Sequence, residues 1–314
     1  MTKPHLLQVG ALPDWDQGPL DAAYTIHRYF DAPDKPAFLA AVGPRIRAIV
    51  TRGDLGAPRA LLDACPALEV ISVFGVGYDA VDIDTCHARG IRITNTPDVL
   101  TGDCADLAVG MMLCLSRNMV AAEKFARDGS WLTGGFPLQR RVWGRRAGIL
   151  GLGRIGHEIA TRLQGFGMDI AYSARSPKNT PANWAYIADP VALAERSDFL
   201  FISLAASAAT RHVVNARVLN ALGPDGMLVN ISRAANIDET ALLDALEART
   251  LGSAALDVFE GEPNLNPRFL ALSNVLLQPH VASGTVETRR AMGQLLRDNL
   301  SAHFAGKPLL TPVI

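Results

Sequence analysis

The segment Ala147-Gly148-Ile149-Leu150-Gly151-Leu152-Gly153-Arg154-Ile155-Gly156 decides the fold of this 314-residue chain. A short apolar run leads into a Gly-x-Gly-x-x-Gly pattern, and an amphipathic stretch from Ile155 to Gln164 follows it. A strand, a glycine turn and a helix in this order are typical of dinucleotide binding, whereas the glycines alone would indicate only a tight turn. We therefore predict that this segment begins a nucleotide-binding domain.

Each part of the turn has a predicted task. Gly151 permits the tight turn, Gly153 lets the backbone approach the pyrophosphate, and Gly156 lets the helix pack close to the strand. Free N–H groups and the helix dipole favour an anion at a helix N-terminus. The helix start at Arg154 and Ile155 is therefore expected to bind the pyrophosphate.

The end of the second strand discriminates between the two nicotinamide cofactors. An NAD site needs Asp or Glu about 20 residues after the turn, for the ribose 2′-hydroxyl. The chain has Tyr172-Ser173-Ala174-Arg175-Ser176 there, with no carboxylate. Arg175 offers a planar fork for a 2′-phosphate, and Ser176 adds a hydroxyl donor. The pattern favours NADP(H); the alternative is that Arg175 is a solvated surface arginine.

The residues that follow the glycine turn predict a doubly wound parallel sheet, because strand-like runs alternate with helical ones. About six strands are expected, at Ala147–Leu150, Met168–Tyr172, Phe199–Leu204, Met227–Ile231, Ser253–Leu256 and Val275–Leu277. Helices are expected between them, at Ile155–Gln164, Val191–Glu195, Ala216–Leu222 and Glu239–Ala248.

The first hundred residues predict a second α/β unit, since β-rich runs again alternate with helical or turn segments. The runs are Leu6–Gly10, Tyr24–Phe30, Ile46–Arg52, Leu68–Phe74 and Ile91–Asn95, and none is followed by a glycine-rich phosphate loop. Helices are expected at about Gly102–Arg117 and Val120–Asp128, with a loop at Trp131–Arg141, and a last helix at Glu287–Phe304 is expected to pack on the first unit.

The predicted fold is thus α/β with two Rossmann-like domains, a nucleotide-binding domain inserted into a flavodoxin-like substrate domain. Residues 1–99 and 283–314 form the substrate domain, and residues 100–282 form the NADP-binding domain.

Composition limits the classes of partner. Hydrophobic residues make up 49% of the chain and charged residues 19%, and the net charge is −1. This balance gives no global field for nucleic acid or an anionic membrane. No run of 18 apolar residues occurs, the start does not resemble a signal peptide, and the four cysteines lack zinc-site spacing. We therefore expect a cytoplasmic protein without a metal.

Three strand ends carry side chains suited to reducing a 2-oxo acid. Arg233 follows a predicted strand directly, where a cation can bind a carboxylate, although a surface arginine would look the same. His280 follows another and can donate a proton near neutral pH. A carboxylate from Glu260 or Glu262 could orient the imidazole, and spacing alone does not choose between them.

The whole chain resembles the D-isomer-specific 2-hydroxyacid dehydrogenases. The motifs that carry this resemblance are Phe74-Gly75-Val76-Gly77-Tyr78-Asp79, Thr94-Asn95-Thr96-Pro97, Gly151–Gly156, Asn230-Ile231-Ser232-Arg233, Leu256-Asp257-Val258-Phe259 and Gln278-Pro279-His280. The resemblance implies that His280 is the acid/base, Glu262 its partner, and Arg233 the substrate-binding cation.

The same resemblance implies further contacts. The amides of Val76 and Gly77 would hold the substrate carboxylate, and Asp257 would lie near the nicotinamide amide, with Ile231 and Ser232 also at the cofactor. Leu55, Tyr78 and Phe136 would set the size of the pocket.

Within the family the chain resembles the NADPH-dependent glyoxylate/hydroxypyruvate and hydroxyphenylpyruvate reductases. Ala174-Arg175-Ser176 matches their phosphate-binding triplet except at Ala174. A second departure is that the proline that the family usually has near Ala205 is missing. The resemblance implies a homodimer formed through the helices at 102–128. The segment Gly134–Leu138 would then cover the partner's substrate pocket, unless it simply packs in the core. A rival hypothesis is a corepressor-like protein that senses a dinucleotide on the same fold without catalysis.

Overall fold

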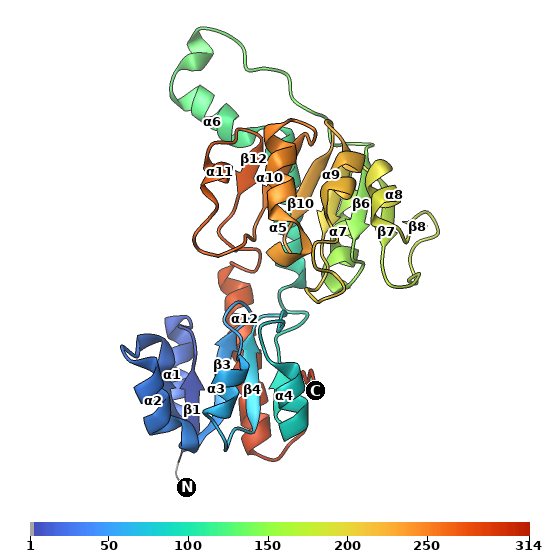
Figure 1. The fold of residues 1–314 in the computed structure, drawn as a ribbon. Coiled ribbons are helices and arrows are strands. Elements are labelled where there is room, and N and C mark those ends of the chain that lie inside the picture. The colour runs from blue at the N-terminus through green and yellow to red at the C-terminus, as the bar shows by residue number, and fades with distance from the viewer. Residues whose placement is uncertain (1–2) are drawn as a thin grey trace. The chain divides into compact units, whose positions relative to one another are not determined.

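The computed structural model describes residues 3–314, and the chain divides into two compact units. One unit contains the chain up to Leu100 together with Ser283–Ile314, and the other contains Thr101–Ala282. Both units are built on a parallel sheet with helices on its two faces, as the ribbon in Figure 1 shows. The predicted α/β class is confirmed.

The sheet of the first unit has five parallel strands in the order β2-β1-β3-β4-β5, which is the flavodoxin-like order. The strands are β1 (His5–Gln8), β2 (Thr25–Arg28), β3 (Ile46–Arg52), β4 (Val70–Phe74) and β5 (Arg92–Thr94). All five residues of β4 are buried, because helices cover both faces of the sheet and leave no polar side.

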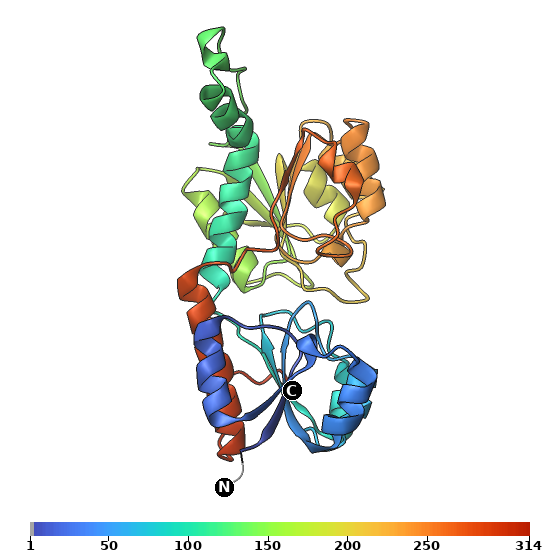
Figure 2. The same ribbon diagram turned by 90° about the vertical axis from the view of Figure 1, so that its left-hand side faces the viewer.

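Helices pack on both faces of this sheet. They are α1 (Asp14–Ala23), α2 (Lys35–Val42), α3 (Arg59–Asp63), α4 (Ile83–Arg89) and α12 (Val286–Phe304), with short 3-10 helices at Tyr29–Asp31 and Gly43–Arg45. Figure 2 shows α1 beside α12 on one face and the other three helices opposite. The buried Asn299 of α12 accepts the amides of Leu310 and Thr311, which fixes the C-terminal segment to this unit.

The second unit contains seven parallel strands in the order β8-β7-β6-β9-β10-β11-β12. They are β6 (Arg146–Leu150), β7 (Asp169–Ser173), β8 (Ala185–Tyr186), β9 (Phe199–Ile202), β10 (Met227–Asn230), β11 (Ser253–Leu256) and β12 (Val275–Leu277). Counted from β6, this is the doubly wound order with one added edge strand. The expectation of about six strands missed β8, whose two residues are too short to form a hydrophobic pattern.

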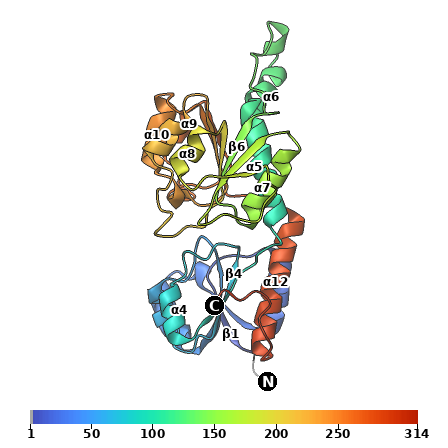
Figure 3. The same cartoon turned by 90° about the vertical axis from the view of Figure 1, so that its right-hand side faces the viewer.

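Helices cover both faces of this second sheet as well. They are α5 (Thr101–Ser116), α6 (Met119–Arg127), α7 (Arg154–Gln164), α8 (Pro190–Glu195), α9 (Ala216–Leu222), α10 (Glu239–Glu247) and α11 (Pro267–Leu270). Figure 3 shows α5 and α7 on one face and α8, α9 and α10 on the other. Beyond α5, α6 extends away from the sheet (Figure 2).

Two local expectations were wrong in detail. The strand predicted at Phe199–Leu204 ends at Ile202, although the amide of Ser203 still donates to the carbonyl oxygen of Leu150 at 3.0 Å. The Ser203 hydroxyl donates to the carbonyl oxygen of Gly151. The predicted loop at Trp131–Arg141 begins inside a 3-10 helix at Ser130–Leu132.

Residues 3–314 contain no single helix that fits a membrane span and no side-chain cluster that fits a metal ion. No single helix there combines the length and apolarity needed to cross a bilayer, although α5 and α6 meet those criteria as a pair bent by 58°. No group of three or more His, Cys, Asp or Glu side chains in this range could hold a metal ion.

Candidate active site

The glycine turn between β6 and α7 has a shape that larger residues cannot adopt. Gly151 has a φ of +101°, and a Cβ added there would lie 2.9 Å from the amide nitrogen of Leu204. A Cβ at Gly156 would lie 2.1 Å from the carbonyl oxygen of Gly151. These two glycines therefore allow the first turn of α7 to lie directly against the end of β6.

The N-terminus of α7 provides a place for an anion. Gly153 is its N-cap and has no side chain to bond the first free N–H groups of the helix. A Cβ built at Gly153 would meet no atom within 4 Å, so the space beside the backbone is open. The helix dipole and this open space fit a dinucleotide pyrophosphate at the start of the helix, where Arg154 and Ile155 are the first residues.

The residues after β7 form an ordered turn. The amide of Lys178 donates to the hydroxyl of Tyr172, 2.9 Å away, and the hydroxyl of Tyr186 donates to the carbonyl oxygen of Ala174 at 3.2 Å. Arg175 and Ser176 lie between these two anchor points and are exposed. A guanidinium held there on a fixed backbone is suited to a 2′-phosphate.

The structure brings two of the predicted catalytic residues into direct contact. His280 Nδ1 lies 2.7 Å from Glu262 Oε2, and Glu262 Oε1 accepts the amide of Phe259 at 2.8 Å. Of the two carboxylates that spacing left open, Glu262 is the one in contact with His280. The Oε1 of Glu260 instead lies 3.8 Å from Nε2 of His212. With Nδ1 on the carboxylate, Nε2 is the imidazole nitrogen left to exchange a proton with a ligand.

The backbone at His280 is held in an unusual conformation. Its φ of +53° lies in the left-handed region, which a residue other than glycine adopts at a cost of about 1–2 kcal/mol. The buried carboxylate of Asp257 accepts the next two amides, from Val281 at 2.7 Å and Ala282 at 2.9 Å. Burial raises the pKa of Asp257, and these two bonds oppose that rise. Asp257 thus stabilises the turn that presents the imidazole.

The segment after β10 is also held by side chains. Asn230 Oδ1 accepts both the amide and the hydroxyl of Ser232, and Ile231 and Ser232 are buried. Arg233 is partly buried, and its Nη1 donates to the carbonyl oxygen of Ser232 at 2.9 Å. Asn236 Nδ2 also reaches the hydroxyl of Ser232 at 3.1 Å. This network fixes the backbone from which Arg233 projects.

The predicted carboxylate ligands Val76 and Gly77 lie in the first unit, in the loop after β4. Gly75 has a φ of +152° and donates its amide to Thr96 Oγ1, while Asn95 Nδ2 donates to the carbonyl oxygen of Val76. Within residues 3–314, the amides of Val76 and Gly77 donate to no protein acceptor. Two such amides in a fixed loop are available for an anion.

The three residues proposed to set pocket size belong to different units. Leu55 is 43% exposed and Tyr78 is 37% exposed, both in the first unit. Phe136 belongs to the second unit, where its ring packs edge-on against Phe125 with the centroids 5.4 Å apart.

Sequence reasoning missed two contacts around the His280–Glu262 pair. Asp257 was predicted at the cofactor from resemblance, and its bonds to the turn after His280 were not foreseen. Glu239 was only the first residue of an expected helix, yet its Oε2 accepts the amide of Glu260 at 2.9 Å. No local pattern signals this second contact, since the two residues are 21 positions apart.

Comparisons with known proteins agree with this geometry. A model of the D-isomer specific 2-hydroxyacid dehydrogenase family, NAD binding domain, matches residues 109–282. A hydroxyphenylpyruvate reductase from Plectranthus scutellarioides is 47% identical over 94% of both chains. A solved 2-hydroxyacid dehydrogenase from Ketogulonicigenium vulgare Y25 is 66% identical with a TM-score of 0.94, covering 100% of this chain and 99% of its own.

A further solved structure was obtained with ligands. An NADPH-dependent glyoxylate/hydroxypyruvate reductase from Sinorhizobium meliloti, in complex with NADP and malonate, is 41% identical with a TM-score of 0.92. The match covers 99% of this chain and 97% of that one.

Proposed function

We propose that this chain, which belongs to the D-isomer specific 2-hydroxyacid dehydrogenase family, uses NADPH to reduce small 2-oxo acids such as glyoxylate and hydroxypyruvate to D-2-hydroxy acids. The observation that carries the proposal is the 2.7 Å contact between His280 and Glu262, in the same unit as the glycine turn. The relative from Sinorhizobium meliloti, which is NADPH-dependent, supports the choice of cofactor.

A reduced nicotinamide bound in this unit would supply the hydride that reduction of the 2-oxo carbon requires. His280 donates a proton from Nε2 to the carbonyl oxygen, while Glu262 holds Nδ1 and stabilises the charged imidazole. Arg233 binds the substrate carboxylate and polarises the carbonyl. The amides of Val76 and Gly77 stay predicted ligands of that carboxylate.

This chain's own backbone, one cation and one hydroxyl would hold the cofactor. The first turn of α7 would bind the pyrophosphate, and Arg175 with Ser176 would bind the 2′-phosphate. The absence of an acid at the end of β7 removes the repulsion that would otherwise exclude NADPH.

The proposal is tested by the loss of NADPH absorbance with a panel of 2-oxo acids, from glyoxylate through hydroxypyruvate to hydroxyphenylpyruvate. Turnover is expected with at least the two smaller acids, and His280→Asn is expected to lower kcat by about 10²–10⁴-fold without weakening NADPH binding. Tight NADPH binding with no turnover on any acid would instead favour the corepressor-like alternative.

We also propose a homodimer, formed through α5, α6 and the segment that follows. Five apolar side chains there are exposed, namely Met119 (46%), Val120 (63%), Trp131 (71%), Leu132 (92%) and Leu138 (101%). Exposed apolar side chains concentrated in one segment of the chain are typical of a surface that another chain covers. Light scattering should give the mass of two chains, and Leu132→Asp should shift it toward one. A monomeric wild type at micromolar concentration would refute the dimer.

A further inference from the structure

Glu239 connects α10 with the loop that carries the catalytic carboxylate. It is the first residue of the helix, and its Oε2 accepts the amide of Glu260 at 2.9 Å. Glu260 stands two positions before Glu262 in the loop after β11. The contact therefore joins the start of a helix to the loop from which the partner of His280 projects.

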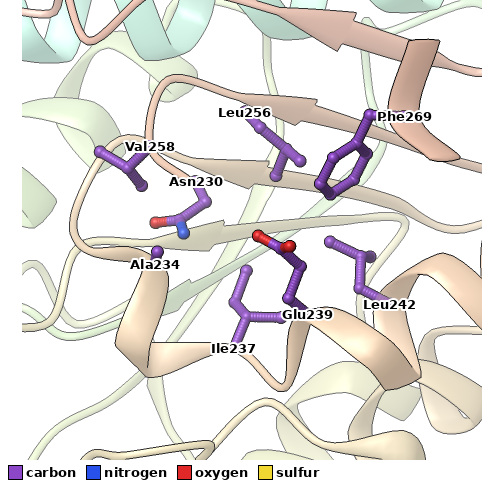
Figure 4. Close-up of a pocket in the computed structure, with 8 residues that line it drawn as sticks. All are labelled: Asn230, Ala234, Ile237, Glu239, Leu242, Leu256, Val258 and Phe269. Atoms are coloured by element: carbon purple, nitrogen blue, oxygen red, sulfur yellow. The ribbon is translucent and has the colours of Figure 1, made fainter. Parts of the chain in front are cut away.

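The position of the Glu239 carboxylate is defined by its surroundings. Figure 4 shows it pointing from α10 toward Leu256, beside a cavity of about 10 Å³ that is also lined by Leu242 and Phe269. A cavity of that size holds about one water at most. The Glu239 side chain is only partly buried, and its bond to the amide of Glu260 is open to solvent. The bond therefore matters for the position of the loop rather than as compensation for a buried charge.

The helix itself favours a negative charge at this place. Asp238 is the N-cap of α10, and its side chain accepts the amide of Ala241 at 3.1 Å. The carboxylate of Glu239 in the first turn adds a favourable interaction with the helix dipole. Glu239 thus has two separable effects, one on the helix through its charge and one on the loop through its acceptor oxygen.

Two successive amides of the loop are bound by two different carboxylates. Phe259 donates to Glu262 Oε1 at 2.8 Å, and Glu260 donates to Glu239 Oε2. Without Glu239, these carboxylate contacts to the loop would be reduced to the one made by Glu262. The Glu262 carboxylate would then have to hold its own loop and orient His280 at the same time.

We propose that Glu239 is a positioning residue of the reaction, because it fixes the loop of Glu262 and so keeps the Glu262–His280 pair aligned for proton transfer. This inference rests on the proposed reductase function. Glu239 touches neither His280 nor a reacting atom in this scheme, and it acts through the backbone of the loop.

Three variants separate its two effects. Glu239→Ala removes the acceptor and the charge, whereas Glu239→Gln keeps an acceptor oxygen and removes the charge. Asp238→Ala is the matched control, since it weakens the N-terminus of the same helix without touching the loop.

Single-turnover reduction of hydroxypyruvate and the affinity for NADPH would be measured for each variant. Glu239→Ala is expected to slow hydride transfer by about 10- to 100-fold, as small misplacements of catalytic groups do, with the NADPH Kd unchanged. Glu239→Gln is expected to restore most of the rate, and Asp238→Ala to lose thermal stability but keep the rate. A Glu239→Ala rate within twofold of wild type would overturn the proposal, as would an equal loss in Glu239→Gln.

Hydrogen exchange tests the contact without relying on activity. The amide of Glu260 is expected to exchange at least about tenfold faster in Glu239→Ala, and at nearly the wild-type rate in Glu239→Gln. Unchanged exchange in Glu239→Ala would refute the anchoring itself. A wild type that reduces no 2-oxo acid would refute the proposed function, whereas the exchange rates would still decide whether Glu239 holds the loop.

Discussion

Replacing Glu262 with glutamine tests how much the negative charge beside His280 contributes. The amide keeps the shape of the side chain and an acceptor for the amide of Phe259, so the main loss is the charge at 2.7 Å from Nδ1. A hydrogen bond to a charged group contributes about 1.5–3 kcal/mol and a neutral one about 0.5–1.5 kcal/mol. The difference is about 1–1.5 kcal/mol, which corresponds to about 5- to 13-fold in rate.

Solvent moderates this effect. The side chain of His280 is 39% exposed and that of Glu262 is 26% exposed, so screening places the expected loss of kcat/KM toward the lower end of that range. The assay is steady-state reduction of glyoxylate with saturating NADPH. Glu260→Gln is the control, because its side chain faces His212 rather than His280. A loss below twofold in Glu262→Gln, or an equal loss in the control, would refute the assignment.

Three further substitutions test the phosphate-binding arginine, the glycine turn and an ion pair of the second unit. Arg175→Asp should lower the preference for NADPH, measured as the ratio of kcat/KM with NADPH to kcat/KM with NADH, by at least about tenfold. Lys178→Asp should change this ratio little. Gly156→Ala should lower the free energy of unfolding by about 1–3 kcal/mol in urea titrations, since the added methyl would lie 2.1 Å from a carbonyl oxygen. Burial alone would raise the pKa of Asp198, but hydrogen bonds from Arg146 outweigh burial and hold the pKa below its usual value. Asp198→Asn should therefore destabilise the fold by about 1–3 kcal/mol at neutral pH. That deficit should shrink as the pH falls through the lowered pKa, where the wild-type carboxylate becomes protonated.

Much of the architecture was readable from the sequence, because its strands are apolar runs bounded by turn residues. The strands predicted at Ile46–Arg52 and Ser253–Leu256 have the observed limits. The two-residue strand Ala185–Tyr186 was missed, since its hydrogen bonds to β7 depend on a neighbour and not on its own pattern.

The candidate site was only partly readable for a related reason. Types of residue at strand ends pointed to His280 and Arg233, and resemblance singled out Glu262. The turn at His280 depends on Asp257, which accepts the amides of Val281 and Ala282 from 24 and 25 positions away in sequence. The loop of Glu262 depends on Glu239. Such contacts arise only when parallel strands bring separate loops to one edge of the sheet.

The central claim is that this chain reduces 2-oxo acids to the D-isomer with NADPH. The most direct test is to incubate the wild-type protein with hydroxypyruvate and NADPH and to separate the glycerate product on a chiral column. We predict D-glycerate in a one-to-one ratio with the NADPH oxidised. L-glycerate, or no glycerate from a folded protein that binds NADPH, would contradict the claim.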